Sequence, residues 1–582
     1  MSHDTGQNWS GLTRRYGWLA LVLVLAACAI PMLIELDRRG PQHAMEGLAL
    51  LTAQETWLRQ HAGEERAWIT PTRNGSVRVR KPPMFVWTCF AAWTGLDPDN
   101  ATTELLIYRA RLVGVGLTVV LLLCTYWIGC TIGDRLLGVL GAAVGGTLLL
   151  LQMQTRMASY DIHLAAWVAL AVAASLQLIV RRTRAPTLGG QLGLWTIAVV
   201  ALSCAIMTKG PVGLLAWAVP VVGAIVVTGR WKVGVIGSMS TVLGASALVL
   251  PWYLYLLATH ESSLDTLLHE YGAELTNAHP WHYYPRVLLK LTFPWTLWLI
   301  GGLCLPFVLG SGQLRRERLI PWLWLVGYVL IFSINAGKSE RYLAPLVPAI
   351  ALVIAFAWYD HQRVAEQGEV DPRSRLVSAP HWVILTLASL GIAPFFVMQD
   401  DLAGSLISSP IAAAITWPIG ITFSAAMLGV ALVGWRWQRR WRPGRAALAT
   451  FIWAVMLTTL GWYGRAFTSD PNALIAQSSR NIALFVGDAP LRYLDLVEFE
   501  ADIPDYRFLL YLRRTVPVVT TRRLERLAKT SANPTYVISS TSRQHHDALR
   551  DHGFELLFEY DETPKRKRTL WTSRSAPPIG SS

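Results

Sequence analysis

The sequence is poor in charged residues. Only 15% of its 582 residues are Asp, Glu, Lys or Arg, whereas 53% are hydrophobic, and the mean hydropathy is +0.36. Soluble domains carry about 25% charged residues, so these values argue against a soluble domain and exclude a disordered chain. The six cysteines form no C-x-x-C pair and all lie in apolar runs. They are therefore interpreted as small buried side chains, and not as disulfide or metal ligands.

Long apolar runs dominate what is present. A bilayer core needs about 20 apolar residues per helix, and the 26 tryptophans suit the two membrane interfaces. Residues 83–97 form a shorter apolar stretch, which fits an interfacial or re-entrant helix better than a crossing. The thirteen predicted spans are 17–35, 111–130, 134–152, 161–180, 192–208, 211–228, 233–257, 285–310, 319–335, 342–358, 380–398, 411–434 and 444–464.

The basic residues orient these spans. With the N-terminus in the cytoplasm, every short basic cluster falls on the cytoplasmic side, as the positive-inside rule requires. These clusters are Arg14–Arg15, Arg181–Arg184, Arg230–Lys232, Arg315–Arg318 and Arg436–Arg445. The formal charge of +14 therefore reflects membrane topology, and no nucleic-acid partner is expected.

The chain changes character after residue 465. Short β-like stretches at 481–486, 515–520, 535–540, 555–560 and 569–572 are separated by helix-like segments at 523–529 and 545–552. This alternation predicts a small α/β domain. We therefore expect a transmembrane domain over residues 1–465, with a first outer loop and interfacial helices over 36–110, and a C-terminal extracytoplasmic domain over 466–582.

Several cations lie outside in this topology and need another explanation. An anionic ligand is the natural one, because Arg and Lys both bind phosphate. Each residue also has a structural interpretation: Lys81 could snorkel, Lys209 could anchor a turn at the interface, and Asp161 could cap a helix. Because all of these residues are expected on one membrane face, ligand binding is favoured over the separate structural roles. The cations are Arg80, Lys81, Lys209, Lys338 and Arg341.

Five motifs in this order resemble the GT-C-fold membrane glycosyltransferases, in the branch of the aminoarabinose transferases and protein O-mannosyltransferases (glycosyltransferase family 39). The first is T-P-T-R-N-G at 70–75 followed by K-P-P-M-F-V-W at 81–87. The others are R-A-R-L at 109–112, R-M-A-S-Y-D at 156–161, T-K-G-P at 208–211, and H-P-W-H-Y-Y at 279–284 with F-P-W at 293–295 and K-S-E-R-Y-L-A-P at 338–345.

The resemblance implies an inverting transferase in the inner membrane that moves a hexosyl or pentosyl group from a polyprenyl-phosphate donor to a lipid or protein acceptor. Such an enzyme acts in cell-envelope chemistry such as lipid A modification. By resemblance Glu46 and Asp161 are catalytic candidates, and Arg80, Lys81, Lys209, Lys338 and Arg341 bind the donor phosphate. Tyr342, His279 and Tyr283 line the substrate pocket.

The sequence departs from the family pattern at two places. The Asp-Glu pair of the first outer loop reads Met45-Glu46 here, and Asp37 competes for the role. The glutamate before Lys-Pro-Pro is replaced by Arg80. In the aminoarabinose transferases that glutamate and the histidine at the position of His279 are associated with a divalent metal, so its loss weakens the case for a metal here.

Three other functions compete with the lipid glycosyltransferase. A protein O-glycosyltransferase shares the fold. A transporter or flippase would also have many spans, but it would show two matching halves and ionisable residues at the midplane. A non-catalytic scaffold for the C-terminal domain would leave the outer cations unexplained.

Overall fold

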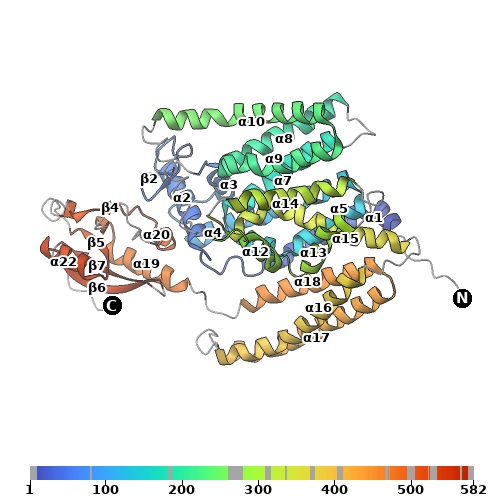
Figure 1. Ribbon diagram of the computed structural model, residues 1–582. Helices are drawn as coiled ribbons and strands as arrows, with labels where there is room; N and C mark the ends of the chain where they lie inside the picture. Colours follow the sequence, from blue (N-terminus) through green and yellow to red (C-terminus); the bar gives the residue numbers. More distant parts are fainter. Residues whose placement is uncertain are drawn as a thin grey trace. The chain divides into compact units, whose positions relative to one another are not determined.

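The computed structural model divides into two compact units (Figure 1). The helical unit comprises Met1–Leu36, Arg80–Met84 and Arg111–Thr468, and the mixed unit comprises Asp37–Val79, Phe85–Ala110 and Ser469–Ser582. The structure describes the whole chain except residues 1–8, 79–80, 181–186, 260–278, 309–315, 335–336, 367–373, 403–409, 466–469, 471, 495–504, 522, 525–533, 564–565 and 574–582.

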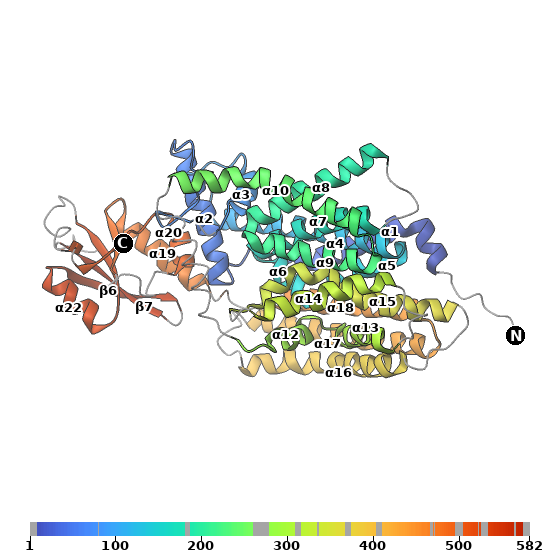
Figure 2. The same ribbon diagram turned by 45° about the horizontal axis from the view of Figure 1, so that its top comes forward.

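The helical unit is a bundle whose long helices run roughly parallel or antiparallel to one another (Figures 1 and 2). Its elements are α1 (Trp9–Leu33), α4 (Thr103–Ile132), α5 (Arg135–Thr147), α6 (Leu149–Thr155), α7 (Tyr160–Val180), α8 (Leu188–Lys209), α9 (Pro211–Thr228), α10 (Trp231–Thr259), α12 (Tyr283–Leu291), α13 (Thr296–Val308), η2 (Arg316–Arg318), α14 (Leu319–Ile334), η3 (Glu340–Leu346), α15 (Val347–Glu366), α16 (Ser374–Leu402), α17 (Pro410–Arg439) and α18 (Pro443–Arg465).

The prediction of a multi-span helical membrane protein is confirmed. Within the described residues, ten helices are long and apolar enough to cross a bilayer, and the bent pair α5–α6 makes eleven. The remaining two predicted spans fall on shorter apolar helices, at Thr296–Phe307 and Leu376–Ile392, so the count of thirteen stays a prediction. Helix α3 (Met84–Trp93) has ten residues and is about 15 Å long, half the thickness of a bilayer core.

Small residues let the central helices approach closely. Helix α7 packs against α8 and α9, and its alanines between Ala165 and Ala174 are fully buried. At Gly213 a Cβ atom would lie 2.7 Å from the backbone carbon of Ala205, so only glycine fits where α9 crosses α8. Close backbone packing of this kind replaces the hydrophobic driving force that helices lack inside a membrane.

The end of α15 holds one end of the bundle together. Tyr359 donates a hydrogen bond to Asp134 at 2.6 Å, and the next residue, Asp360, pairs with Arg318. His361 then contacts Gln438 of α17 at 2.8 Å between Nε2 atoms, and Gln362 accepts from the backbone N–H of Gly444 at 2.7 Å. These four consecutive polar residues thus connect the end of α15 to the ends of neighbouring helices.

The mixed unit combines helices with a five-stranded sheet in the order β4-β3-β5-β7-β6, in which β3 pairs in parallel with β4 and β5, and β7 pairs antiparallel with β5 and β6 (Figure 1). Its elements are α2 (Ala44–His61), β1 (Thr72–Arg73), β2 (Ser76–Val77), α3, α19 (Ala473–Val486), β3 (Leu491–Leu494), α20 (Tyr506–Leu512), β4 (Val518–Val519), β5 (Tyr536–Ser540), α22 (Arg543–Asp551), β6 (Glu555–Thr563) and β7 (Arg566–Thr572).

The T-P-T-R-N-G motif forms a tight turn between β1 and β2. Asn74 and Gly75 have φ values of 49° and 81°, which asparagine and glycine adopt most readily. The carboxylate of Glu55 accepts hydrogen bonds from the N–H groups of Asn74 and Gly75, at 2.6 and 2.7 Å. The Asn74 amide then pairs with the backbone of Val516, donating to its carbonyl and accepting from its N–H at 2.7 Å each.

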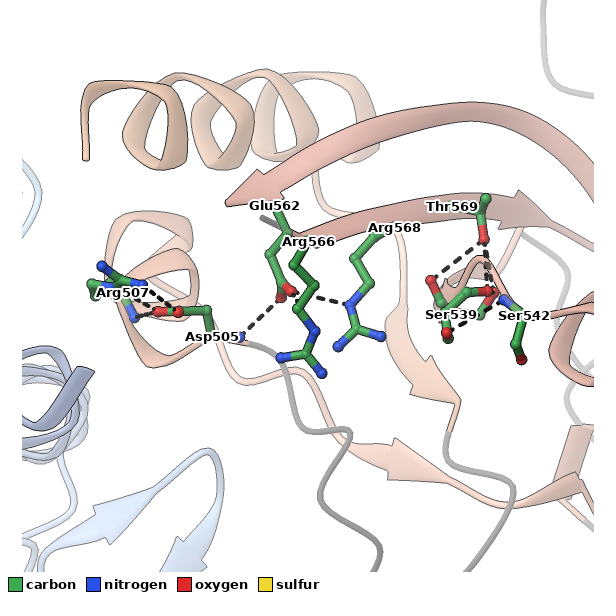
Figure 3. A network of polar contacts seen from close by, with 9 residues as sticks. Asp505, Arg507, Ser539, Ser542, Glu562, Arg566, Arg568 and Thr569 are labelled. Carbon is green, nitrogen blue, oxygen red and sulfur yellow. Dashed lines mark hydrogen bonds and ion pairs between the residues drawn. The ribbon is translucent and has the colours of Figure 1, made fainter. Parts of the chain in front are cut away.

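A buried ionic network joins strands β6 and β7 to the start of α20 (Figure 3). The Glu562 carboxylate is fully buried and accepts from Arg568 Nε at 3.0 Å and from the Asp505 N–H at 2.9 Å. Burial raises the pKa of Glu562, and the attraction of Arg568 opposes that rise. Burial also acts to raise the pKa of Asp505, but hydrogen bonds from Arg507 outweigh it and lower this pKa overall.

Most of the predicted C-terminal elements are confirmed, with one error. Strands β4 to β7 and helix α22 fall on the predicted stretches, but residues 481–486 belong to helix α19 and not to a strand. This segment reads as β-like because it ends on a short apolar run, and such runs do not distinguish a strand from a buried helix. The helix expected at 523–529 lies mostly outside the described residues.

We predict that Asn74→Gly loosens the segment around Val516. Glycine keeps the left-handed turn but removes both side-chain hydrogen bonds, each worth about 1 kcal/mol. Hydrogen exchange at the Val516 amide should therefore become roughly 10- to 30-fold faster. Asn481→Ala, on the exposed face of α19, should leave exchange at Val516 unchanged. Equal rates for Asn74→Gly and the unsubstituted protein would contradict the assigned role.

Candidate active site

Asp161 lies at the centre of a cluster of polar side chains at one end of the helical unit. It begins α7 and is only 4% exposed. Lys209 is the last residue of α8, and its Nζ lies 2.5 Å from Asp161 Oδ1. Gly210, with a φ of 64°, turns the chain from α8 directly into α9. The T-K-G-P motif therefore ends a helix with its cation beside the carboxylate.

A second cation reaches Asp161 from another element. Arg341 in η3 places its Nε 3.7 Å from Asp161 Oδ2, so each carboxylate oxygen faces a different cation. The neighbouring Tyr342 ring lies 4.1 Å from Lys209 Nζ and 5.5 Å from the guanidinium carbon of Arg341. A tyrosine face attracts cations, and here it contributes to holding both in place.

The cluster carries a net positive charge. Asp161, Lys209 and Arg341 sum to +1, and burying an ion costs several kcal/mol unless partners compensate for its lost hydration. The Arg341 Nε–H is buried and makes no hydrogen bond within the described part of the chain. At 3.7 Å the Asp161 carboxylate is beyond hydrogen-bond distance of this N–H, and a buried donor of this kind in a site of net positive charge is suited to bind an anion.

Lys338 begins a second group on the same segment. Its Nζ donates to the backbone carbonyl of His279 at 2.9 Å, and its side chain is almost fully buried. The imidazole of His279 stacks on the Tyr283 ring, with centroids 4.3 Å apart. Burial and the nearby carboxylate of Glu340 raise the pKa of Tyr283, so its phenol stays protonated. Glu340 itself pairs with Lys290 at 3.4 Å.

Seven of the site residues predicted from the sequence thus lie in two groups of contacting side chains in the helical unit. Asp161, Lys209, Arg341 and Tyr342 form the first, and Lys338, His279 and Tyr283 form the second. The segment from Lys338 to Tyr342 contributes to both.

The remaining predicted residues lie elsewhere or are not described. Lys81 is half-buried just before α3, in the Arg80–Met84 segment of the helical unit. Arg80 lies outside the described residues. Glu46 belongs to the mixed unit, where its carboxylate accepts the Gln42 N–H at 2.7 Å at the start of α2. This is the position at which a glutamate caps a helix.

Two arginines of the sequence motifs have structural roles. Arg156 donates to the carbonyl groups of Pro31 and Met32, at 3.2 and 3.0 Å, and lies 4.3 Å from the Trp462 ring. Arg111 donates to the Leu36 carbonyl at 3.1 Å. Both satisfy backbone acceptors close to the end of α1.

Sequence reasoning missed Tyr328. Its hydroxyl donates to the Tyr342 carbonyl at 2.9 Å and so fixes the backbone of the residue that faces both cations. Nothing in the sequence marks it, because it is one aromatic residue within the apolar run of α14.

The residues that the structure describes do not form a divalent-metal site. Such a site needs several carboxylate, imidazole or thiolate ligands. No group of three His, Cys, Asp or Glu side chains that could hold an ion occurs among the described residues. His279 presents its ring to Tyr283, and the sequence has Arg80 where the metal-associated glutamate is expected. No step is therefore derived through a metal.

Two known protein families match parts of the chain. Residues 93–266 match the dolichyl-phosphate-mannose-protein mannosyltransferase family, and residues 263–400 match the Alg9-like mannosyltransferase family.

Curated relatives are undecaprenyl phosphate-alpha-4-amino-4-deoxy-L-arabinose arabinosyl transferases. One from Pseudomonas fluorescens is 32% identical over 183 residues, which cover 29% of this chain and 31% of the relative. One from Sodalis glossinidius is 27% identical over 399 residues, which cover 64% and 66%. The chain thus matches from about one third to two thirds of the length of these relatives.

Solved structures show the fold. The crystal structure of ArnT from Cupriavidus metallidurans bound to undecaprenyl phosphate superimposes with a TM-score of 0.68 at 17% identity, covering 96% of this chain and 99% of that one. The archaeal oligosaccharyltransferase AglB from Archaeoglobus fulgidus gives a TM-score of 0.51 at 11% identity, covering 96% and 74%. These findings confirm the resemblance drawn from the motifs. The chain is a multi-span membrane protein with the fold of the ArnT structures, and parts of its sequence are similar to aminoarabinose transferases.

Proposed function

We propose that the protein transfers a sugar from a polyprenyl-phosphate donor to a lipid acceptor. The observation that carries this proposal is the buried, net positive cluster of Asp161, Lys209 and Arg341. Its motifs lie in a chain whose relatives are named for arabinosyl transfer from undecaprenyl phosphate. The related ArnT structure contains undecaprenyl phosphate.

The charges match the chemistry of the reaction. The bond between the anomeric carbon and the phosphate oxygen breaks with its electron pair moving to the phosphate, through a state with oxocarbenium character. Negative charge on the leaving phosphate therefore grows as the acceptor oxygen attacks from the opposite face. Fixed cations at that phosphate stabilise the transition state more than the ground state. We assign this role to Lys209, Arg341 and Lys338, with Lys81 and Arg80 as further candidates.

Asp161 is assigned a positioning role in this proposal. Because its two oxygens face Lys209 and Arg341, the carboxylate holds the cations in place and compensates for one of their charges. Glu46 remains the candidate for orienting or deprotonating the acceptor, which a hydroxyl acceptor requires and an ionised phosphate acceptor does not. Tyr342, Tyr283 and His279 are proposed to line the substrate pocket.

The proposed location is the cytoplasmic membrane, with the site on the outer face. Arg230 and Arg318 lie at the end of the bundle opposite Asp161, as their contacts with Ile179 and Asp360 indicate. Gln438, which directly precedes Arg439 and Arg440, contacts His361 at the same end. By the positive-inside rule this basic end is cytoplasmic. The N-terminus is then cytoplasmic, and the C-terminal domain from residue 466 is periplasmic.

Transfer can be measured directly. The purified full-length protein is incubated with radiolabelled polyprenyl-phosphate sugars, pentosyl and hexosyl, and with envelope lipids or protein extracts as acceptors. The proposal expects label in the lipid fraction. Label in protein instead would replace the lipid acceptor by a protein acceptor, and transfer from none of the donors would overturn the proposal.

We predict that Lys209→Gln lowers kcat/KM by about 100-fold or more, because the phosphate loses a fixed cation in the transition state. Lys290→Gln is the matched control, since its ion pair with Glu340 is exposed; it should change kcat/KM by less than about twofold. Both variants should elute from size exclusion as the unsubstituted protein does. A similar loss in both variants would show that Lys209 has no special role.

A double-variant cycle separates positioning from proton transfer. If Asp161 acts by holding Lys209, Asp161→Asn and Lys209→Gln together should cost less than the sum of their separate losses, with a coupling of about 1–3 kcal/mol in transition-state stabilisation. The pH profile of Asp161→Asn should keep its shape. Additive losses, or a missing acid limb in Asp161→Asn, would instead identify Asp161 as the base.

A further inference from the structure

A group of arginines joins α17 to α18 at the end of the bundle opposite Asp161. We name Arg436–Arg445 the arginine turn; it holds five arginines within ten residues and no Asp or Glu. Arg436, Arg439 and Arg440 are exposed, and none of them pairs with a carboxylate among the described residues.

The turn has a fixed backbone shape. Helix α17 ends with hydrogen bonds from the N–H of Arg442 to the Trp437 carbonyl at 3.0 Å, and from the N–H of Trp441 to the Gln438 carbonyl at 3.1 Å. This pattern is a Schellman motif, which usually has glycine at the left-handed position. Here that position is Trp441, with a φ of 54°. A bulky residue in this region is strained and persists only where its surroundings hold it.

Contacts below the turn supply that support. The Trp441 ring lies 5.7 Å from the imidazole of His361, which contacts Gln438. Gln362 binds the Gly444 N–H on the other side. The end of α15 therefore anchors the turn, and the arginines project from a rigid backbone.

Helix-end electrostatics do not explain the whole set. Cations are favourable at the end of α17, where Arg436 and Arg439 lie, but unfavourable in the first turn of a helix. Arg445 lies in the first turn of α18, which begins at Pro443. The positive-inside rule accounts for the sign of this charge, and its concentration across both helix ends is stabilised by a neighbouring anionic group.

The position of the turn identifies the partner. Leu432 and Val433, one turn before Arg436, are large apolar side chains with exposed fractions of 48% and 43%, as expected of a surface that faces lipid chains. Trp435 follows, with the Arg439 guanidinium 4.7 Å from its ring. Tryptophan marks the membrane interface. The arginines thus begin where the exposed apolar residues end, which is the place of lipid phosphates beside a membrane-spanning helix.

We propose that the arginine turn binds the headgroups of anionic phospholipids. Guanidinium groups bind phosphate through paired hydrogen bonds, and a basic cluster directly beyond a transmembrane helix attracts anionic lipids. The turn presents exposed arginines, among them Arg436, Arg439 and Arg440, to these headgroups from a backbone that is already ordered. The bound lipid is a neighbour of the bundle and is distinct from the polyprenyl-phosphate donor at the opposite end.

Native mass spectrometry of the purified full-length protein tests this. Phosphatidylglycerol and phosphatidylcholine are added at equal concentration, and bound copies of each are counted. We expect at least about threefold preference for phosphatidylglycerol, and its loss in Arg436→Gln/Arg439→Gln/Arg440→Gln. The corresponding lysine triple should keep most of the preference, because it keeps the charges. Single glutamine variants are measured as well, so that the comparison remains if the triple does not fold.

The matched control removes three exposed arginines elsewhere. Arg523→Gln/Arg543→Gln/Arg550→Gln changes the net charge equally, and all three residues are exposed in the mixed unit. It should keep the full lipid preference. The proposal is overturned if the arginine-turn variants keep the preference, or if the control loses it to the same extent.

Discussion

The bundle depends on one buried carboxylate that faces two cations from different helices. Asp161 starts α7, Lys209 ends α8, and Arg341 lies in the 3-10 segment before α15. None of the three charges would be stable alone in an apolar interior. Their pairing therefore fixes three elements at one end of the bundle and leaves one positive charge uncompensated. The same interaction that locks the helices thus forms the centre of the proposed phosphate site.

Helix α15 connects this cluster to the opposite end of the bundle. Its candidate span is almost entirely buried. It follows the segment that carries Arg341 and Tyr342, and it ends in the four polar residues from Tyr359 to Gln362. The proposed donor site and the arginine turn are therefore both supported by one helix. A rigid scaffold of this kind keeps cations at fixed positions, which is what electrostatic stabilisation of a leaving phosphate requires.

The mixed unit is held together by a different type of contact. Side chains from its N-terminal part bind backbone groups of the C-terminal part, as Asn74 does at Val516, while Arg513 in turn donates to the Pro98 carbonyl at 2.6 Å. The T-P-T-R-N-G motif, which contributed to the family resemblance, thus has a structural task here. A motif shared by a family need not lie at the reacting atoms.

The sequence by itself determined the membrane class, most spans, the α/β character of the C-terminal part and the residue types of the site, because hydropathy and charge are local properties of the chain. It did not determine which charges meet. Asp161, Lys209 and Arg341 are separated by 48 and 132 positions, and only the packing of α7 against α8 and of η3 against α7 brings them together. Gln438 was invisible for the same reason, since its partner His361 lies 77 positions away, whereas Tyr328 is one aromatic residue within an apolar run. Only tertiary structure shows that Arg156 binds backbone carbonyl groups at the end of α1, whereas Arg341 pairs with a carboxylate that already faces Lys209.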